Sequence, residues 1–106
     1  MENLSHILLV FIFGYLAGSI PFGFLLTKFT GKGDIRKKGS GNIGATNVLR
    51  NSGKILGFLT FILDAAKGVF FFWIADKYFG LISNNYALNI AIISPVLGHI
   101  FPIWLK

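Results

Sequence analysis

Three long apolar segments alternate with polar ones along the chain, and their lengths predict membrane-spanning helices. Residues 7–27 contain no charged side chain, and these 21 residues suffice for a hydrocarbon core, which needs about 20 residues. Residues 55–75 and 86–105 form two further apolar spans, separated by a polar turn at residues 76–85. This pattern predicts an all-α integral membrane fold with three transmembrane helices, built as a single membrane domain over residues 1–106.

The first apolar span has a cleaved signal peptide as its rival interpretation. Glu2 is acidic and no Lys or Arg precedes the span, which argues against a signal peptide. Gly14 and Gly18 follow the small-xxx-small pattern that lets membrane helices approach closely, and Gly23 offers another small position. Pro21 has no backbone N–H, so it predicts a kink or an end of the helix.

The composition supports the membrane class. Hydrophobic residues make up 54% of the chain and charged residues 13%, whereas soluble domains carry roughly 25% charged residues. There is no cysteine, which excludes disulfides and thiolate metal sites. The two histidines, His6 and His99, are too few and too far apart to argue for a metal site. The chain therefore predicts no metal site, and we assign it no cofactor.

Positive charge is concentrated in the connector at residues 28–54. This segment holds seven of the ten Lys and Arg residues, with Asp34 as its single acid. The positive-inside rule predicts that the connector is cytoplasmic, and that the N-terminus and the 76–85 turn lie outside. The net charge of +6 lies beside apolar spans, which favours anionic lipid headgroups or phosphorylated substrates over nucleic acid.

The glycine-rich run at residues 39–50 of the connector carries the most distinctive chemistry. Three glycines within six residues let backbone N–H groups approach a ligand closely. Apolar residues at the end of the run predict a short helix that begins near Ser40–Asn42, and a helix N-terminus favours anions. Spacing alone puts Thr46, Asn47 and Arg50 on one helix face. The candidate phosphate contacts are Ser40, Gly41, Asn42, Gly44, Thr46, Asn47 and Arg50.

Two of these residues also have simpler interpretations. Ser40 could be only the N-cap of a helix, a role worth about 1 kcal/mol. A covalent seryl intermediate has no local support, because the run contains no histidine that could act as its base. Arg50 could contact lipid headgroups, or its planar fork could bind a phosphate. The run also departs from the dinucleotide-binding fingerprint, since no strand precedes it.

Three ionisable residues outside the connector are further candidates for chemistry. Asp64 and Lys67 are spaced i, i+3, so we favour a neutralising pair on one helix face over a functional relay. His99 lies near the predicted cytoplasmic end of the third span. It could sit at the interface, or it could act as an acid, a base or a phosphate ligand.

Four motifs taken together resemble the bacterial acyl-phosphate:glycerol-3-phosphate acyltransferases, integral membrane enzymes of phospholipid biosynthesis. The Ser–Gly–Asn run is the specific one, and the order, spacing and membrane context of all four agree. The resemblance covers essentially the whole chain. Its motifs are Gly18–Gly23, Ser40–Arg50, Asp64–Gly68 and Gly98–Pro102.

The resemblance implies transfer of a fatty acyl group from acyl-phosphate to the 1-hydroxyl of glycerol 3-phosphate, without a metal or acyl-CoA. The product is lysophosphatidic acid, and the location is the bacterial inner (cytoplasmic) membrane. Ser40 and Arg50 fall on family positions needed for catalysis. His99 opens a second motif tied to glycerol 3-phosphate binding. The surrounding phosphate-binding motif comprises Gly41, Asn42, Gly44, Thr46 and Asn47.

The resemblance also implies that these residues are the N-terminal half of a longer family fold. Family members are about twice as long, and their second motif continues into a Gly-Gly-Lys-Gly-like run. We therefore expect a C-terminal half as partner and little activity from these residues alone. Two other classes stay open: a non-enzymatic three-helix membrane anchor or assembly subunit with a lipid-binding loop, and a transporter fragment that uses Asp64 and Lys67.

Overall fold

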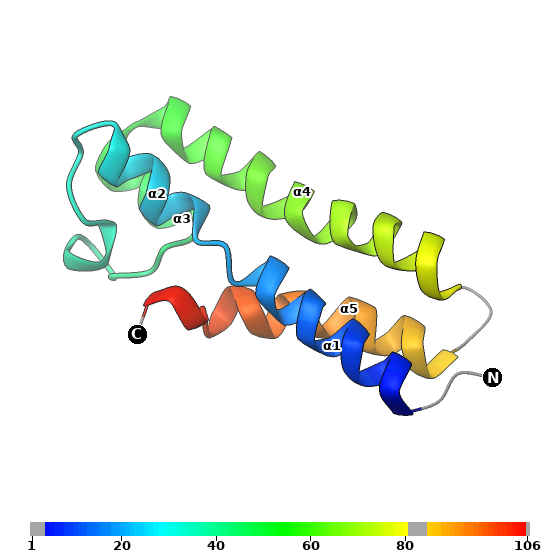
Figure 1. The fold of residues 1–106 in the computed structure, drawn as a ribbon. Coiled ribbons are helices and arrows are strands. Elements are labelled where there is room, and N and C mark those ends of the chain that lie inside the picture. Colours follow the sequence, from blue (N-terminus) through cyan, green and yellow to red (C-terminus); the bar gives the residue numbers. More distant parts are fainter. Residues whose placement is uncertain (1–3, 81–84, 106) are drawn as a thin grey trace. The chain divides into compact units, whose positions relative to one another are not determined.

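The fold is helical, with no strand among the residues that the structure describes. The structure is a computed structural model and describes residues 4–80 and 85–105 (Figure 1). Its contacts divide the chain into two compact units. The first unit combines the segment up to Ile20 with the segment from Ala66 onward, and the second comprises Pro21–Ala65.

The first apolar span is a helix interrupted near its middle. Helix α1 covers Leu4–Gly18 and helix α2 covers Phe22–Phe29. Pro21 occupies the N-cap position of α2, where its missing N–H costs no helical hydrogen bond. The break that Pro21 predicts is therefore confirmed. Taken across this break, Leu4–Phe29 is long and apolar enough to cross a membrane.

The other two predicted spans differ in length. Helix α4 covers Lys54–Phe79, and its 54–78 portion is also long and apolar enough to cross a membrane. Helix α5 covers Asn85–Ile100, and a 3₁₀ turn, η3, follows at Ile103–Leu105. The helix ends earlier than the predicted 86–105 span because Pro102 disfavours helical geometry in the residue before it. Two helical segments thus have the length of a membrane span, and the third is shorter.

In the first unit, α1 and α5 run side by side along a seam of small residues (Figure 1). A Cβ atom added to Gly14 would lie 2.0 Å from the Ser94 hydroxyl oxygen. One added to Gly18 would lie 2.0 Å from the Pro95 carbonyl oxygen. Both distances are far below van der Waals contact; at Gly14 the Ser94 and Phe71 side chains would have to shift, and at Gly18 the backbone of Pro95 leaves room only for hydrogen. The close approach predicted from the Gly14-xxx-Gly18 spacing is confirmed.

The distribution of side chains is inverted relative to a water-soluble protein. Ser19, Thr27, Thr60 and Ser94 are fully buried, and the first three donate to the backbone carbonyl of the residue four positions earlier. Large apolar side chains instead face outward, as expected where lipid surrounds the helices and small residues pack between them. The exposed set includes Leu8, Phe13, Phe58, Phe61, Phe70, Trp73, Ile92 and Val96.

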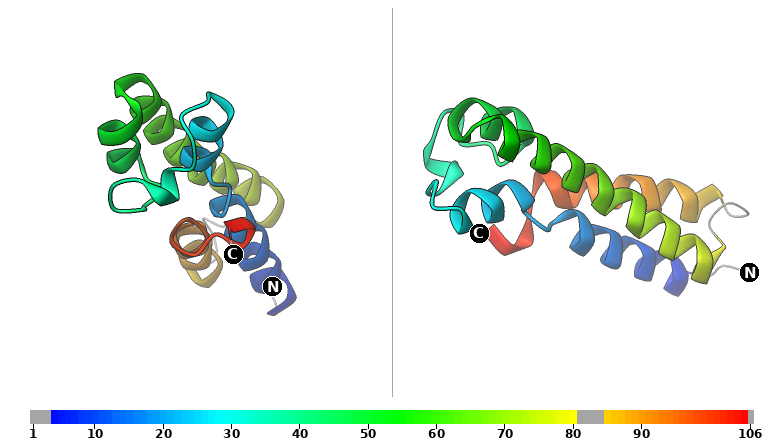
Figure 2. Two further views of the ribbon diagram at one scale, coloured as in Figure 1. Left: turned by 90° about the vertical axis from the view of Figure 1, so that its left-hand side faces the viewer. Right: turned by 90° about the horizontal axis from the view of Figure 1, so that it is seen from above.

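The second unit folds the basic connector around a small core of its own. A 3₁₀ turn, η1, covers Ile35–Lys37, and helix α3 covers Ala45–Ser52. The connector turns back so that α3 contacts both α2 and η1 (Figure 2). The buried centre is formed by Ile35, Val48 and Leu56, with Phe24, Leu26 and Ile43 packed against it. This core holds the glycine-rich run in place.

Candidate functional site

The buried side-chain amide of Asn47 organises the glycine-rich loop. Its nitrogen donates to the carbonyl oxygens of Asn42 at 2.8 Å and Lys38 at 3.0 Å, and lies 3.5 Å from that of Ile35. Its oxygen accepts from the Ser40 backbone N–H at 3.3 Å and from the Asn51 amide at 2.7 Å. One side chain therefore fixes the loop backbone on both sides of Ser40.

Two glycines in this loop are required by its geometry. Gly41 has φ +78°, a conformation that side chains with a Cβ rarely adopt. Gly39 has φ +53°, and a Cβ added there would lie 2.3 Å from the Asn47 amide oxygen. Gly39 thus makes room for the amide that holds the loop. It belongs to the run but was not among the predicted contact residues.

Helix α3 begins at Ala45, three residues beyond the predicted Ser40–Asn42 start, because Asn42 holds a turn ahead of it. The Asn42 side-chain oxygen accepts from the Gly44 N–H at 2.7 Å, and this local bond competes with helix formation. Gly44, not Ser40, is the N-cap residue of α3, so the simpler interpretation of Ser40 as a helix cap is wrong. The Ser40 hydroxyl oxygen instead accepts from the Asn42 N–H at 3.3 Å.

The two connector arginines have different surroundings. Arg36 forms a bidentate pair with Asp34, with nitrogen-to-oxygen distances of 3.0 and 2.8 Å. The hydrogen bond from Arg36 lowers the pKa of the Asp34 carboxyl to about 2, so both groups are charged at neutral pH. Arg50 is exposed, and no described residue holds its guanidinium in a hydrogen bond or ion pair. Arg50 is therefore the arginine that is available to an anion.

The predicted shared face of Thr46, Asn47 and Arg50 is divided by burial. Thr46 and Arg50, four residues apart on α3, are exposed, whereas Asn47 is only 6% exposed. Thr46 lies in the first turn of α3, whose N–H groups have no partner within the helix, and Arg50 lies one turn further on, in the last turn. A phosphate at the first turn would meet backbone donors and a hydroxyl, with the guanidinium one turn away.

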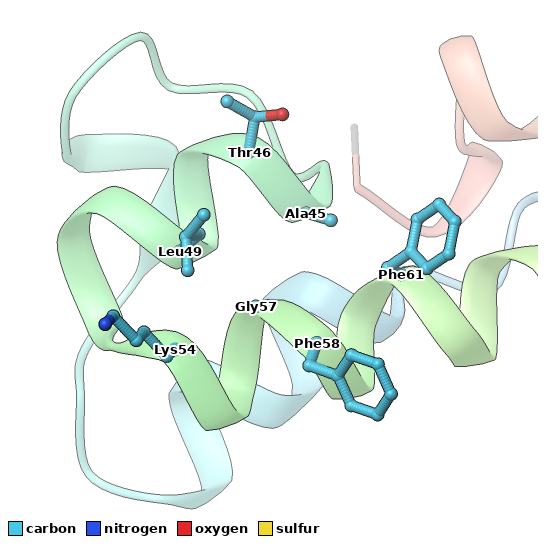
Figure 3. Close-up of a pocket in the computed structure, with 7 residues that line it drawn as sticks. All are labelled: Ala45, Thr46, Leu49, Lys54, Gly57, Phe58 and Phe61. Carbon is cyan, nitrogen blue, oxygen red and sulfur yellow. The ribbon is translucent and has the colours of Figure 1, made fainter.

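A pocket of about 270 Å³ adjoins α3. Its walls are mostly apolar, with Lys54 and Phe61 at opposite ends and Thr46 on the α3 side (Figure 3). Such a pocket suits an apolar chain that ends in an anionic group. The lining residues are Ala45, Thr46, Leu49, Lys54, Gly57, Phe58 and Phe61.

His99 belongs to the other compact unit, near the end of α5. Its ring nitrogen Nδ1 lies 3.0 Å from the amine of Lys67 on α4. The same amine donates to the carbonyl oxygen of Ile20 at 3.0 Å. The structure thus brings together the predicted residues of the connector, and it places His99 with Lys67.

Sequence reasoning missed Asn51 and the contacts of Lys67. Asn51 completes the amide network, and its i, i+4 spacing from Asn47 was the available signal. Lys67 was interpreted through its spacing from Asp64, and that pair stays a prediction. The sequence signal for the long-range contacts of Lys67 was its position in an apolar span, because a buried cation needs polar partners.

These features define the class of protein: a helical membrane protein with outward apolar side chains and a basic, glycine-rich connector folded around Asn47. The chain belongs to the glycerol-3-phosphate acyltransferase family, whose family model matches residues 8–106.

Individual relatives agree with this assignment. A glycerol-3-phosphate acyltransferase of Erythrobacter litoralis is 53% identical over 94 residues, which are 89% of this chain and 45% of the relative. One of Sinorhizobium fredii is 51% identical over 104 residues, covering 98% of this chain and 49% of the relative. The chain spans about half the length of the curated relatives it matches.

A solved structure matches a similar share of the chain. It is a crystal structure of PlsY (YgiH), an integral membrane glycerol 3-phosphate acyltransferase, in its glycerol 3-phosphate form. The sequences are 44% identical and the TM-score is 0.80, over 93% of this chain and 48% of that one.

Proposed function

We propose that this chain carries the connector site of an acyltransferase that uses acyl-phosphate and glycerol 3-phosphate. The fatty acyl group is transferred to the 1-hydroxyl of glycerol 3-phosphate, and lysophosphatidic acid and inorganic phosphate are formed. Family membership supports this reaction, and the observation that carries it is the loop fixed by Asn47. That loop holds Ser40 ahead of α3, the helix that carries Arg50 in its last turn.

The chemistry needs little from the protein beyond positioning and charge stabilisation. The substrate 1-hydroxyl oxygen forms a bond to the acyl carbon, the bond from that carbon to the phosphate oxygen breaks, and the hydroxyl proton leaves with the phosphate. Phosphate is a good leaving group, so no covalent enzyme intermediate is required. Arg50 and the α3 amides stabilise the charge that develops on the departing phosphate, and the Ser40 hydroxyl donates to the reacting oxygens.

Binding of the substrates follows from the same groups. We assign phosphate contacts to the loop residues and place the acyl chain in the apolar pocket, which adjoins α3. His99 contributes to the binding of glycerol 3-phosphate, as its second family motif implies. No metal or cofactor takes part in this scheme. The proposed phosphate contacts are Gly41, Asn42, Gly44 and Thr46, and Asn47, whose amide is engaged with the loop backbone, holds these residues in place.

Arg50→Lys should cost about 1–3 kcal/mol of transition-state stabilisation, or roughly a fivefold to 150-fold loss in kcat/KM, because lysine cannot form two parallel bonds to a phosphate. The assay joins these 106 residues to the remaining half of the Erythrobacter litoralis relative and measures lysophosphatidic acid formation in lipid. Arg36→Lys is the matched control, since Arg36 is engaged by Asp34. Equal losses in the two variants would contradict the assignment of Arg50.

Two further variants separate an enzyme from a membrane anchor. In the protein that joins these 106 residues to the relative's other half (the chimera), Ser40→Ala should abolish most turnover. If the chain were only a membrane anchor, this substitution would leave its function unchanged. The 106 residues alone should show little turnover, because the residues of the relatives' other half are absent from the assay. Robust turnover by these residues alone would refute the need for a second half.

We further propose that the protein is a multi-pass protein of the bacterial inner membrane with three spans, and with residues 28–54 in the cytoplasm. The excess of basic residues in this connector supports that orientation. A cysteine placed at Lys37 should resist an impermeant thiol reagent in intact cells, and one placed at Asn84 should react. The opposite labelling pattern would reverse the orientation, and lysed cells provide the control for reactivity.

A further inference from the structure

Lys67 lies at the centre of a polar cluster inside the first compact unit. Its side chain is 9% exposed, in a helix surrounded by apolar residues. The amine contacts two groups that are distant in sequence, the Ile20 carbonyl oxygen and the His99 ring, each at 3.0 Å. Burying a cation is costly, so a lysine at this position indicates that its charge or its hydrogen bonds have a function.

The Ile20 carbonyl provides a fixed anchor for this amine. It lies two residues past the end of α1, in the break between α1 and α2. Pro21 causes that helix to end there. The break in the first apolar span thus creates the acceptor that holds Lys67 in position.

The contact with His99 selects one form of the imidazole ring. A lysine ammonium has three donors and no acceptor, so with Lys67 charged the Nδ1 atom that it contacts accepts the hydrogen bond. Nδ1 is then unprotonated, the ring is neutral, and its single N–H lies on Nε2. A histidine in this form offers a defined donor to an anionic oxygen.

We propose that Lys67 is a positioning residue that holds His99 in its Nε2–H form, so that the ring donates a hydrogen bond to the phosphate of glycerol 3-phosphate. The hydrogen bond from the His99 ring to the substrate phosphate rests on the proposed function. Lys67 itself acts through His99. Its amine contacts both the Ile20 carbonyl oxygen and the His99 ring.

Nitrogen NMR of the purified chain in detergent micelles tests the tautomer directly and needs no substrate. With ¹⁵N-labelled histidine, only His6 and His99 contribute, and His6→Gln assigns them. We expect the Nε2–H pattern for His99 in the wild type and in Lys67→Arg. Lys67→Met should lose this preference. Lys77→Met is the matched control because Lys77 is an exposed lysine on the same helix.

Two results would overturn the proposal: an Nδ1–H pattern in the wild type, or an unchanged Nε2–H pattern in Lys67→Met. The wild-type spectrum decides the question even if Lys67→Met does not fold. In the chimera, Lys67→Met should raise the KM for glycerol 3-phosphate about tenfold, with a smaller change in kcat, as expected for one charge-assisted hydrogen bond. Lys67→Arg should restore KM. A wild-type chimera without acyl transfer would contradict the proposed function and leave the NMR result intact.

Discussion

Asn47→Leu is expected to open the glycine-rich loop and to remove acyl transfer by the chimera. Leucine has nearly the same size but cannot donate to the three loop carbonyls or accept from the Ser40 N–H. Each buried polar group left without a partner costs about 1–3 kcal/mol, so the loop should lose on the order of 3–5 kcal/mol. Ser40 and Arg50 would then no longer be held relative to each other.

Hydrogen exchange measures this change directly. In the purified chain, the backbone amides of residues 38–44 should exchange much faster in Asn47→Leu than in the wild type. Asn89→Leu supplies the control, because it makes the same substitution at an exposed position on α5. Unchanged exchange at residues 38–44 in Asn47→Leu would show that other contacts hold the loop.

Gly18→Ala is expected to destabilise the first compact unit by about 3 kcal/mol, the upper end of the cost of overpacking. The added methyl carbon would lie 2.0 Å from the Pro95 carbonyl oxygen and 2.5 Å from the Pro95 Cα. Both are backbone atoms, so no side-chain rotation can relieve the clash. The helices α1 and α5 would have to separate, and their van der Waals attraction falls steeply with distance.

The matched control is Gly68→Ala, on α4. No atom lies within 4 Å of a Cβ added at Gly68, so this substitution should be neutral or should stabilise the helix by up to about 1 kcal/mol. The midpoint of unfolding in increasing SDS, measured by circular dichroism, compares the two variants. Similar midpoints for Gly18→Ala and Gly68→Ala would contradict the role of the glycine seam.

Features that depend on local covalent geometry could be predicted from the sequence. The missing N–H of Pro21 predicts the end of α1, and the spacing of Gly14 and Gly18 predicts a helix neighbour at close range. Both arguments need only one residue type and its position in a helix. The neighbour itself, α5, could not be derived, because several apolar helices fit the same glycine surface.

Features that depend on side-chain hydrogen bonds were harder to predict. The start of α3 was placed too early because an Asn42 side chain can either accept from the backbone or face solvent, and spacing does not decide between them. Asn47 was expected to contact phosphate. The structure shows its amide engaged with carbonyls that are five to twelve residues away, which only the folded loop brings together. The contacts of Lys67 span 32 and 47 residues, beyond the reach of any helical periodicity.

The amide network of Asn47 has a consequence for the order of folding. Its bonds close loops of only 4 to 12 residues, whereas the glycine seam joins α1 to α5 across almost the whole chain. Short loops lose little entropy on closing and form quickly, so contact order favours the connector over the seam. During synthesis the connector can fold once α3 and the start of α4 have left the ribosome. The glycine-rich loop can then be in place before α5 has been translated.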